Sequence, residues 1–127
     1  MTLLEEIAKS PYALVTTFRK NGNPVPTPVW IVPFEDGLGV WTVPHFGKVK
    51  RIRKNPAVTV ATCDLRGNNA GPSMSGTASL LDFAGTQQVR AAIRRKYGLV
   101  GRLTLLGSRI RRGKDGVIGI KIVAAAE

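Results

Sequence analysis

The chain has 127 residues, with 19 lysines and arginines against 8 aspartates and glutamates, which gives a formal net charge of +11. This length suits one domain with a real hydrophobic core, which we expect over residues 1–127. A single cysteine and a single histidine, His45, exclude an intramolecular disulfide and a cysteine metal cluster, and leave little basis for a histidine-dependent hydrolase.

Hydrophobic and turn patterns divide the chain into short elements. In chain order these are a helix at 2–9, strands at 12–19, 25–34 and 38–43, a helix at 45–54, strands at 57–64 and 73–81, helices at 86–96 and 100–112, and a strand at 117–123. Asn21-Gly22-Asn23 predicts a hairpin between the first two strands. Four prolines in the second strand remove ladder donors and place parts of it at an edge or bulge. Gly98 is expected to end one late helix, and Gly107 to break the next.

Six short antiparallel strands with short helices between them predict a mainly β (α+β) fold, a six-stranded antiparallel split β-barrel with short flanking helices. No apolar run reaches the roughly 18 residues of a membrane span, and the N-terminal residues do not read as a signal peptide. We therefore expect a cytoplasmic protein with no membrane partner.

The positive charge gathers in two places, within residues 48–54 and between residues 90 and 114. Such an excess favours a polyanionic partner: nucleic acid, anionic lipid or a phosphorylated cofactor. Nucleic-acid modules usually interleave aromatic and basic side chains. The only aromatic residue in the larger cluster is Tyr97, which disfavours nucleic acid as the partner.

Residues 37–56 carry the strongest functional signal. A strand ends in Trp41-Thr42, and a loop leads from it into the basic helix. Free backbone N–H groups, the helix dipole and ammonium groups converge at such a helix start and suit a phosphate. The indole and hydroxyl suit a flat aromatic ring, so this segment predicts a flat aromatic ligand that carries a phosphate.

The phase of the basic helix separates two faces. At ~100° per residue, Phe46, Val49 and Ile52 share an apolar stripe, and Arg53 projects near it. The opposite, basic face holds Lys48, Lys50, Arg51 and Lys54. The simplest alternative to a ligand site is that this basic run is only a solvated helix face.

Several short motifs in fixed order resemble a known family. They are the segments 12–19, 21–25, 27–30, 40–42 and 47–56, together with Arg94-Arg95-Lys96-Tyr97-Gly98. Their order and spacing resemble the pyridoxamine-phosphate-oxidase-like split-barrel proteins, and more narrowly their actinobacterial branch that uses the deazaflavin coenzyme F420. The resemblance extends over essentially the whole chain.

The resemblance implies a homodimer with the cofactor in a groove between subunits. Trp41 and Thr42 match an aromatic-Thr pair that lines the flavin in FMN-using members. Those members grip the FMN phosphate with a Ser-Arg-Lys-x-x-Gln-Leu motif, of which Lys48 matches the lysine. Gly47 and Arg51 stand where that motif has Arg and Gln, and residues 25–32 lack the charges that FMN members carry there. Apolar residues of strands 38–43 and 57–63 could supply the subunit interface, and the loop 66–72 could reach the neighbouring site.

The resemblance also implies a set of cofactor-binding residues, with no residue assigned to catalysis or to a metal. The set is Thr27, Pro28, Val29, Trp30, Trp41, Thr42, Gly47, Lys48, Val49, Lys50 and Arg51. The implied function is an F420-dependent oxidoreductase that moves a hydride between the deazaflavin and a small electron-poor organic substrate. Three alternatives stay open: an FMN-binding oxidase or reductase of the same fold, a non-catalytic cofactor carrier, and a basic nucleic-acid-binding module.

Overall fold

The computed structural model describes residues 2–42, 47–112 and 117–125, and over residues 99–112 it describes the backbone alone. Seven strands form the sheet: β1 (Ala13–Phe18), β2 (Pro24–Val29), β3 (Val32–Phe34), β4 (Gly37–Thr42), β5 (Ala57–Thr62), β6 (Met74–Leu80) and β7 (Ile118–Ala124). Three helices flank it: α1 (Leu3–Lys9), α2 (Gly47–Lys54) and α3 (Phe83–Arg112).

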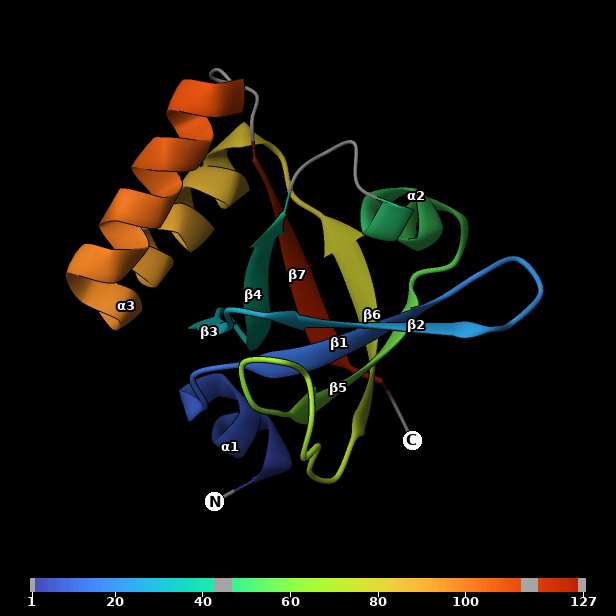
Figure 1. Ribbon diagram of the computed structural model, residues 1–127. Helices are drawn as coiled ribbons and strands as arrows, with labels where there is room; N and C mark the ends of the chain where they lie inside the picture. The colour runs from blue at the N-terminus through green and yellow to red at the C-terminus, as the bar shows by residue number, and fades with distance from the viewer. Residues whose placement is uncertain (1, 43–46, 113–116, 126–127) are drawn as a thin grey trace.

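The order of the strands makes the sheet curl into a split barrel. Hydrogen-bonded neighbours follow the order β2-β1-β5-β6-β7-β4-β3, and every pairing is antiparallel. The two edge strands, β2 and β3, are consecutive in the chain and only Trp30 and Ile31 join them. A sheet whose edges are joined by two residues has to curl until those edges approach each other, as Figure 1 shows. The predicted split β-barrel is confirmed.

The strand predicted over residues 25–34 is divided in two, which raises the count from six to seven. Trp30 and Ile31 leave the ladder where the chain passes from one edge of the sheet to the other. β2 pairs only with β1, so its prolines need no second ladder partner. Their predicted place at an edge is confirmed.

The core lies inside the curled sheet. Its fully buried side chains come from most strands and include Val15, Leu38, Val40, Val58, Val60, Ile120 and Ile122. Each such burial contributes about 1.5–3 kcal/mol. Most apolar side chains of β4 and β5 are thus buried in their own chain, although Ala57 is exposed and Trp41 is half-buried. The curl of the sheet turns these buried side chains inward, so they are not available to supply the subunit interface expected from the sequence.

The helices cover different parts of the sheet. α1 places Ile7 fully in the core, and Thr2 caps it by accepting a hydrogen bond from Glu5 N at 3.2 Å. α2 packs on β1 and β6, while α3 packs on β3, β4 and β7 (Figure 1).

The long helix α3 consists of two helical parts with a break between them. The break falls at Gly98, with φ 59° and ψ −136°, where the chain reverses direction (Figure 1). Left-handed φ values favour glycine, so the helix end predicted there is confirmed. The break predicted at Gly107 is wrong, because the backbone stays helical through that residue to Arg112.

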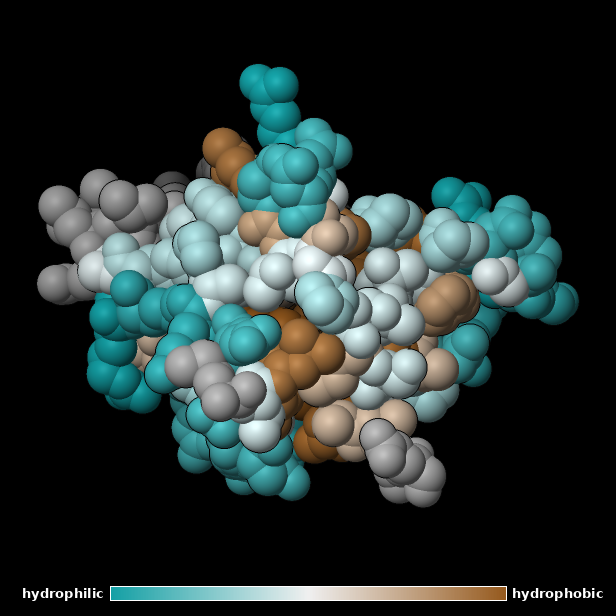
Figure 2. All heavy atoms as spheres, turned by 90° about the horizontal axis from the view of Figure 1, so that it is seen from below, coloured by the Kyte–Doolittle hydropathy of each residue, from teal (hydrophilic) through white to brown (hydrophobic). Residues whose placement is uncertain are grey.

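Seen from below in Figure 2, the surface is mostly hydrophilic, with hydrophobic side chains near its centre and in smaller areas elsewhere. Within the described residues, no helix is both long enough and apolar enough to cross a membrane.

Candidate functional site

A cavity of about 520 Å³ lies between β2, the end of β4 and the start of α2. It brings together most of the predicted cofactor-binding residues: Thr27, Pro28, Val29, Trp30, Trp41, Thr42, Gly47, Lys48 and Arg51. Val49 and Lys50 lie elsewhere, since Val49 is fully buried and Lys50 is exposed beside a second cavity. His45 and Phe46 lie outside the described residues.

Two lining residues, Tyr12 and Leu65, were missed from the sequence. β1 and β2 pair with Ala13 opposite Val29, so extending that register by one residue would have placed Tyr12 opposite Trp30. Leu65 comes from the loop between β5 and β6, and no pattern in the sequence marks it. It reaches the cavity of its own chain, and 66% of its surface is exposed.

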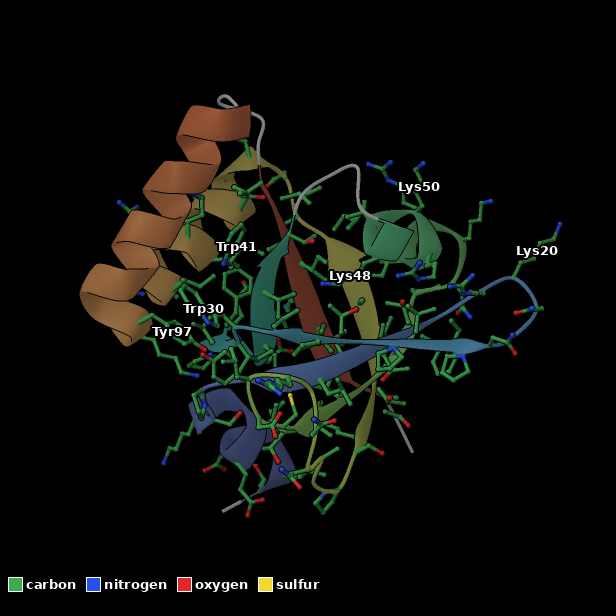
Figure 3. All side chains as sticks on the ribbon, viewed as in Figure 1. Lys20, Trp30, Trp41, Lys48, Lys50 and Tyr97 are labelled. Carbon is green, nitrogen blue, oxygen red and sulfur yellow. The ribbon has the colours of Figure 1, made fainter. Side chains whose placement is uncertain are left out.

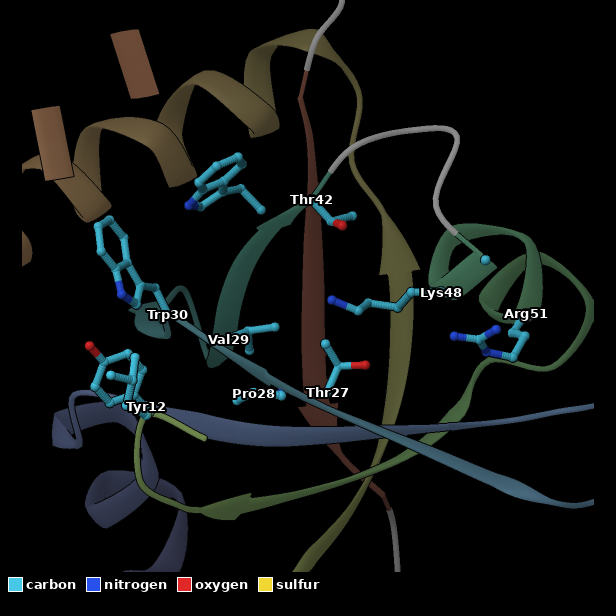
Figure 4. Close-up of a pocket in the computed structure, with 11 residues that line it drawn as sticks. Tyr12, Thr27, Pro28, Val29, Trp30, Thr42, Lys48 and Arg51 are labelled. Atoms are coloured by element: carbon cyan, nitrogen blue, oxygen red, sulfur yellow. The ribbon is translucent and has the colours of Figure 1, made fainter. Parts of the chain in front are cut away.

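The cavity has an aromatic end and a cationic end. Tyr12 and Trp30 lie on one side, while Lys48 and Arg51 project from α2 on the other (Figure 4). Trp41 also lines the cavity, and Figure 3 shows it on the same side as Trp30. No aspartate or glutamate of the described residues lines it. This division suits a ligand with a flat ring at one end and an anion at the other.

Lys48 points from the first turn of α2 into the cavity, and Figure 4 shows its amine between Thr27 and Thr42. Only 5% of the residue is exposed. Among the described residues no group hydrogen-bonds or ion-pairs with its Nζ. Burial, aided by the nearby positive charge of Arg51, lowers the pKa of Lys48 to about 8. A buried cation without a counter-charge is unfavourable, so the cavity is electrostatically complementary to an anion.

The helix phase predicted from the sequence was wrong for two cations. The phase places Lys48 on the basic face opposite the apolar stripe, yet Lys48 is buried. It places Arg53 near the apolar stripe, yet Arg53 is exposed. Lys48 and Ile52 are four residues apart, so they lie on the same face of the helix. The buried arc therefore runs from Lys48 through Ile52 to Val49.

Arg51 is held in place by the sheet. Its Nε donates a hydrogen bond of 2.7 Å to Thr17 Oγ1, and Thr17 is fully buried in β1. Arg51 also lines the second cavity, of about 630 Å³, between α2 and the β1–β2 hairpin. That cavity is lined by Phe18, Arg19, Lys20, Lys50, Arg51, Lys54 and Asn55. Arg51 thus lines both cavities; Figure 3 shows Lys20 and Lys50 near the second one.

The lining offers binding groups rather than an acid–base pair. Thr27 and Thr42 supply hydroxyls, and the start of α2 supplies backbone N–H groups near Lys48. In the part of the chain that the structure describes, no three His, Cys, Asp or Glu side chains gather to hold a metal ion. The arrangement can therefore bind and orient a ring with an anionic group.

The curled sheet and the cavity between β2, β4 and α2 define a split-barrel protein with a candidate ligand site at the edge of the barrel. The chain belongs to the pyridoxamine 5'-phosphate oxidase family, whose model matches residues 2–125. That family includes oxidoreductases and binds flavin-like cofactors. A search of the curated proteins found no match.

Solved structures share the fold at low sequence identity. One is the heme storage protein HutZ from Vibrio cholerae, at 14% identity and a TM-score of 0.70, covering 100% of this chain and 93% of that one. Another is a conserved hypothetical protein from Mycobacterium tuberculosis, at 17% identity and a TM-score of 0.73, covering 99% of this chain and 82% of that one. A third is described as an F420 reductase, at 18% identity and a TM-score of 0.63, covering 99% of this chain and 96% of that one. At these identities the likeness shows the fold alone.

Proposed function

We propose that this protein binds coenzyme F420 in the cavity between β2, β4 and α2, and acts with it as an oxidoreductase on a small electron-poor organic substrate. The observation that carries the proposal is the Lys48 ammonium, which has no partner among the described residues and is buried at the cationic end of a cavity whose other end is aromatic. A phosphate there would supply the counter-charge that Lys48 lacks among the described residues.

The residues present fit such a cofactor. Trp30, Trp41 and Tyr12 offer faces for a flat ring and shield it from water. Lys48, Arg51 and the N–H groups at the start of α2 would hold the phosphate. When bound, the deazaflavin supplies hydride-transfer chemistry, and the protein contributes position and exclusion of solvent. The described lining offers no carboxylate to act as a catalytic acid, and the proposal assigns none.

The second cavity distinguishes F420 from FMN in this proposal. F420 carries a tail of several glutamates, whereas FMN ends at its phosphate. Arg19, Lys20, Lys50 and Lys54 surround the second cavity with positive charge, and Arg51 connects it to the first. The tail carboxylates would lie there, where clustered cations raise the local concentration of an anion.

An FMN-binding oxidase or reductase is the second candidate. The β2 side of the cavity disfavours FMN. Its lining residues carry no charge: Thr27, Pro28, Val29 and Trp30. A carrier that binds the cofactor without turnover uses the same residues. Consumption of reduced F420 in the presence of a quinone or enone separates the carrier from the enzyme.

The active form in this proposal is a homodimer, and each chain is one domain. The family match over nearly the whole chain supports the single domain, and members of the family commonly act as dimers. A second subunit would cover the mouth of the cavity, where Leu65 exposes 66% of its surface.

Titration of the purified protein with F420 and with FMN, following ligand fluorescence, tests the proposal. We expect saturable F420 binding that Lys48→Met weakens. Absence of F420 binding, or a protein that purifies with FMN, would overturn it.

A further inference from the structure

The break in α3 at Gly98 lies beside two segments that are distant in sequence, the end of α1 and the β2–β3 junction. Lys96 and Tyr97 immediately precede Gly98, where the helix breaks. A Cβ at Gly98 would meet nothing within 4 Å, so glycine is required there by its φ of 59° rather than by space. The break leaves Lys96 and Tyr97 facing the end of α1 and the β2–β3 junction, and Figure 3 shows Tyr97 beside Trp30.

Lys96 joins these segments through a single ammonium group. Its Nζ donates hydrogen bonds to the carbonyl oxygens of Ala8 at 2.9 Å, Ser10 at 2.6 Å and Ile31 at 2.5 Å. An ammonium has three N–H donors, so each donor has one carbonyl acceptor. A neutral side chain of the same length would leave these partly buried carbonyls without that donor.

Tyr97 adds a second connection to the same place. Its Oη donates to Pro11 O at 2.7 Å and accepts from Ile31 N at 3.0 Å. Its ring stacks on Trp30, with centroids 4.3 Å apart and planes within 9°. Trp30 lines the cavity, and so does Tyr12, which follows Pro11 directly.

We infer that Lys96 and Tyr97 are positioning residues that set the aromatic wall of the cavity. Neither lines the cavity, so neither would touch the ligand. Tyr97 fixes the plane of the Trp30 indole, and Lys96 fixes the backbone on both sides of that contact. The inference rests on the proposed site in the cavity, but not on which flat ligand occupies it.

The two tryptophans allow a direct optical test. In a Trp41→Phe background Trp30 is the only tryptophan, so near-ultraviolet circular dichroism and acrylamide quenching report on its environment. In that background, Lys96→Met and Tyr97→Leu should each remove most of the tryptophan dichroism and increase quenching. Arg94→Met is the matched control, because it removes an exposed positive charge from the same helix and should leave both signals unchanged.

Ligand titration in the natural background gives the second readout. Lys96→Met should weaken binding of whichever of F420 and FMN the protein binds by about tenfold, the order of losing a charge-assisted hydrogen bond. If Lys96→Met does not fold, Tyr97→Phe replaces it, since that variant keeps the ring and loses only the hydroxyl. Tyr97→Phe should loosen Trp30 to a smaller extent than Tyr97→Leu.

Two results would overturn the inference. One is a lower melting temperature with unchanged Trp30 spectra and unchanged affinity, which would make the Lys96 contacts purely structural. The other is an Arg94→Met effect equal to that of Lys96→Met. A protein that binds neither ligand would overturn the proposed function. The optical measurements on Trp30 would still show whether Lys96 and Tyr97 position its indole.

Discussion

The guanidinium of Arg51 folds back onto Gly47, one helical turn earlier in α2. A Cβ on Gly47 would lie 2.7 Å from Arg51 Nη1, which is closer than real contacts allow. The hydrogen bond from Arg51 Nε to Thr17 Oγ1 also holds the guanidinium. The resemblance to FMN-using proteins aligns Gly47 with an arginine of their phosphate motif. Here Arg51 therefore brings a guanidinium close to the position that would otherwise carry one.

Gly47→Ala should separate ligand affinity from stability. The added methyl group would displace the end of a flexible side chain, so folding should tolerate it, and alanine favours a helix by up to about 1 kcal/mol over glycine. We expect an unchanged or higher melting temperature together with several-fold weaker F420 binding. Thr17→Val, which removes the acceptor of the Arg51 bond, should weaken binding in the same direction. Unchanged affinity in both variants would show that the position of Arg51 does not matter to the ligand.

Lys48→Met should weaken F420 binding by about 1–3 kcal/mol, the range for losing a charged hydrogen-bond partner. The same variant should melt at a higher temperature without ligand, because a buried charge without a counter-charge among the described residues is removed. Arg53→Met, an exposed charge on the same helix, is the control for general electrostatic attraction. Equal losses of affinity in the two variants would mean that the anion is not held at Lys48.

The pH dependence should have opposite signs for binding and for stability. Burial lowers the pKa of Lys48 from its ordinary value of 10.5 to about 8. Anion binding needs the charged amine, so affinity for F420 should fall as the pH rises above about 8. In the ligand-free protein the unfolded state keeps the proton up to a higher pH, so the free energy of unfolding should rise between about pH 8 and 10.5. Burial also lowers the pKa of Lys96 to about 8, so Lys48→Met serves as the reference in both experiments.

Light scattering at micromolar concentration should give twice the chain mass of 13.7 kDa. Leu65→Asp should shift the protein toward monomer and weaken cofactor binding, since Leu65 stands at the mouth of the cavity. Phe83→Asp, which changes another largely exposed apolar residue, one outside the cavity lining, should do neither. A monomer that binds F420 with full affinity would contradict the shared groove.

The fold could be predicted largely from local patterns. The hairpin at Asn21-Gly22, the edge position of the prolines and the helix end at Gly98 each follow from the backbone limits of one or two residues. The gap at Trp30 and Ile31 could not be predicted in this way. It depends on how the sheet curls to bring its edges together, which is a property of all seven strands.

The candidate site was predictable in composition but not in orientation. The lining of the cavity by Trp41, Thr42 and Lys48 agrees with the residues chosen from the sequence. The burial of Lys48 does not follow from the sequence, because the helix phase places it opposite the apolar stripe of Val49 and Ile52. Leu65 enters from a loop whose path depends on tertiary contacts, among them Gly67 against Leu14 and Pro28. Such contacts cannot be predicted from local sequence patterns.

The central claim is tested most directly by comparing F420 and FMN in one fluorescence titration at low and high salt. We predict that F420 binds at least about tenfold more tightly than FMN, a difference of about 1.4 kcal/mol. Salt should weaken F420 more than FMN, because the contacts of an exposed tail in the second cavity are screened. Equal affinities with equal salt dependence would contradict the account, since the second cavity would then contribute nothing to binding.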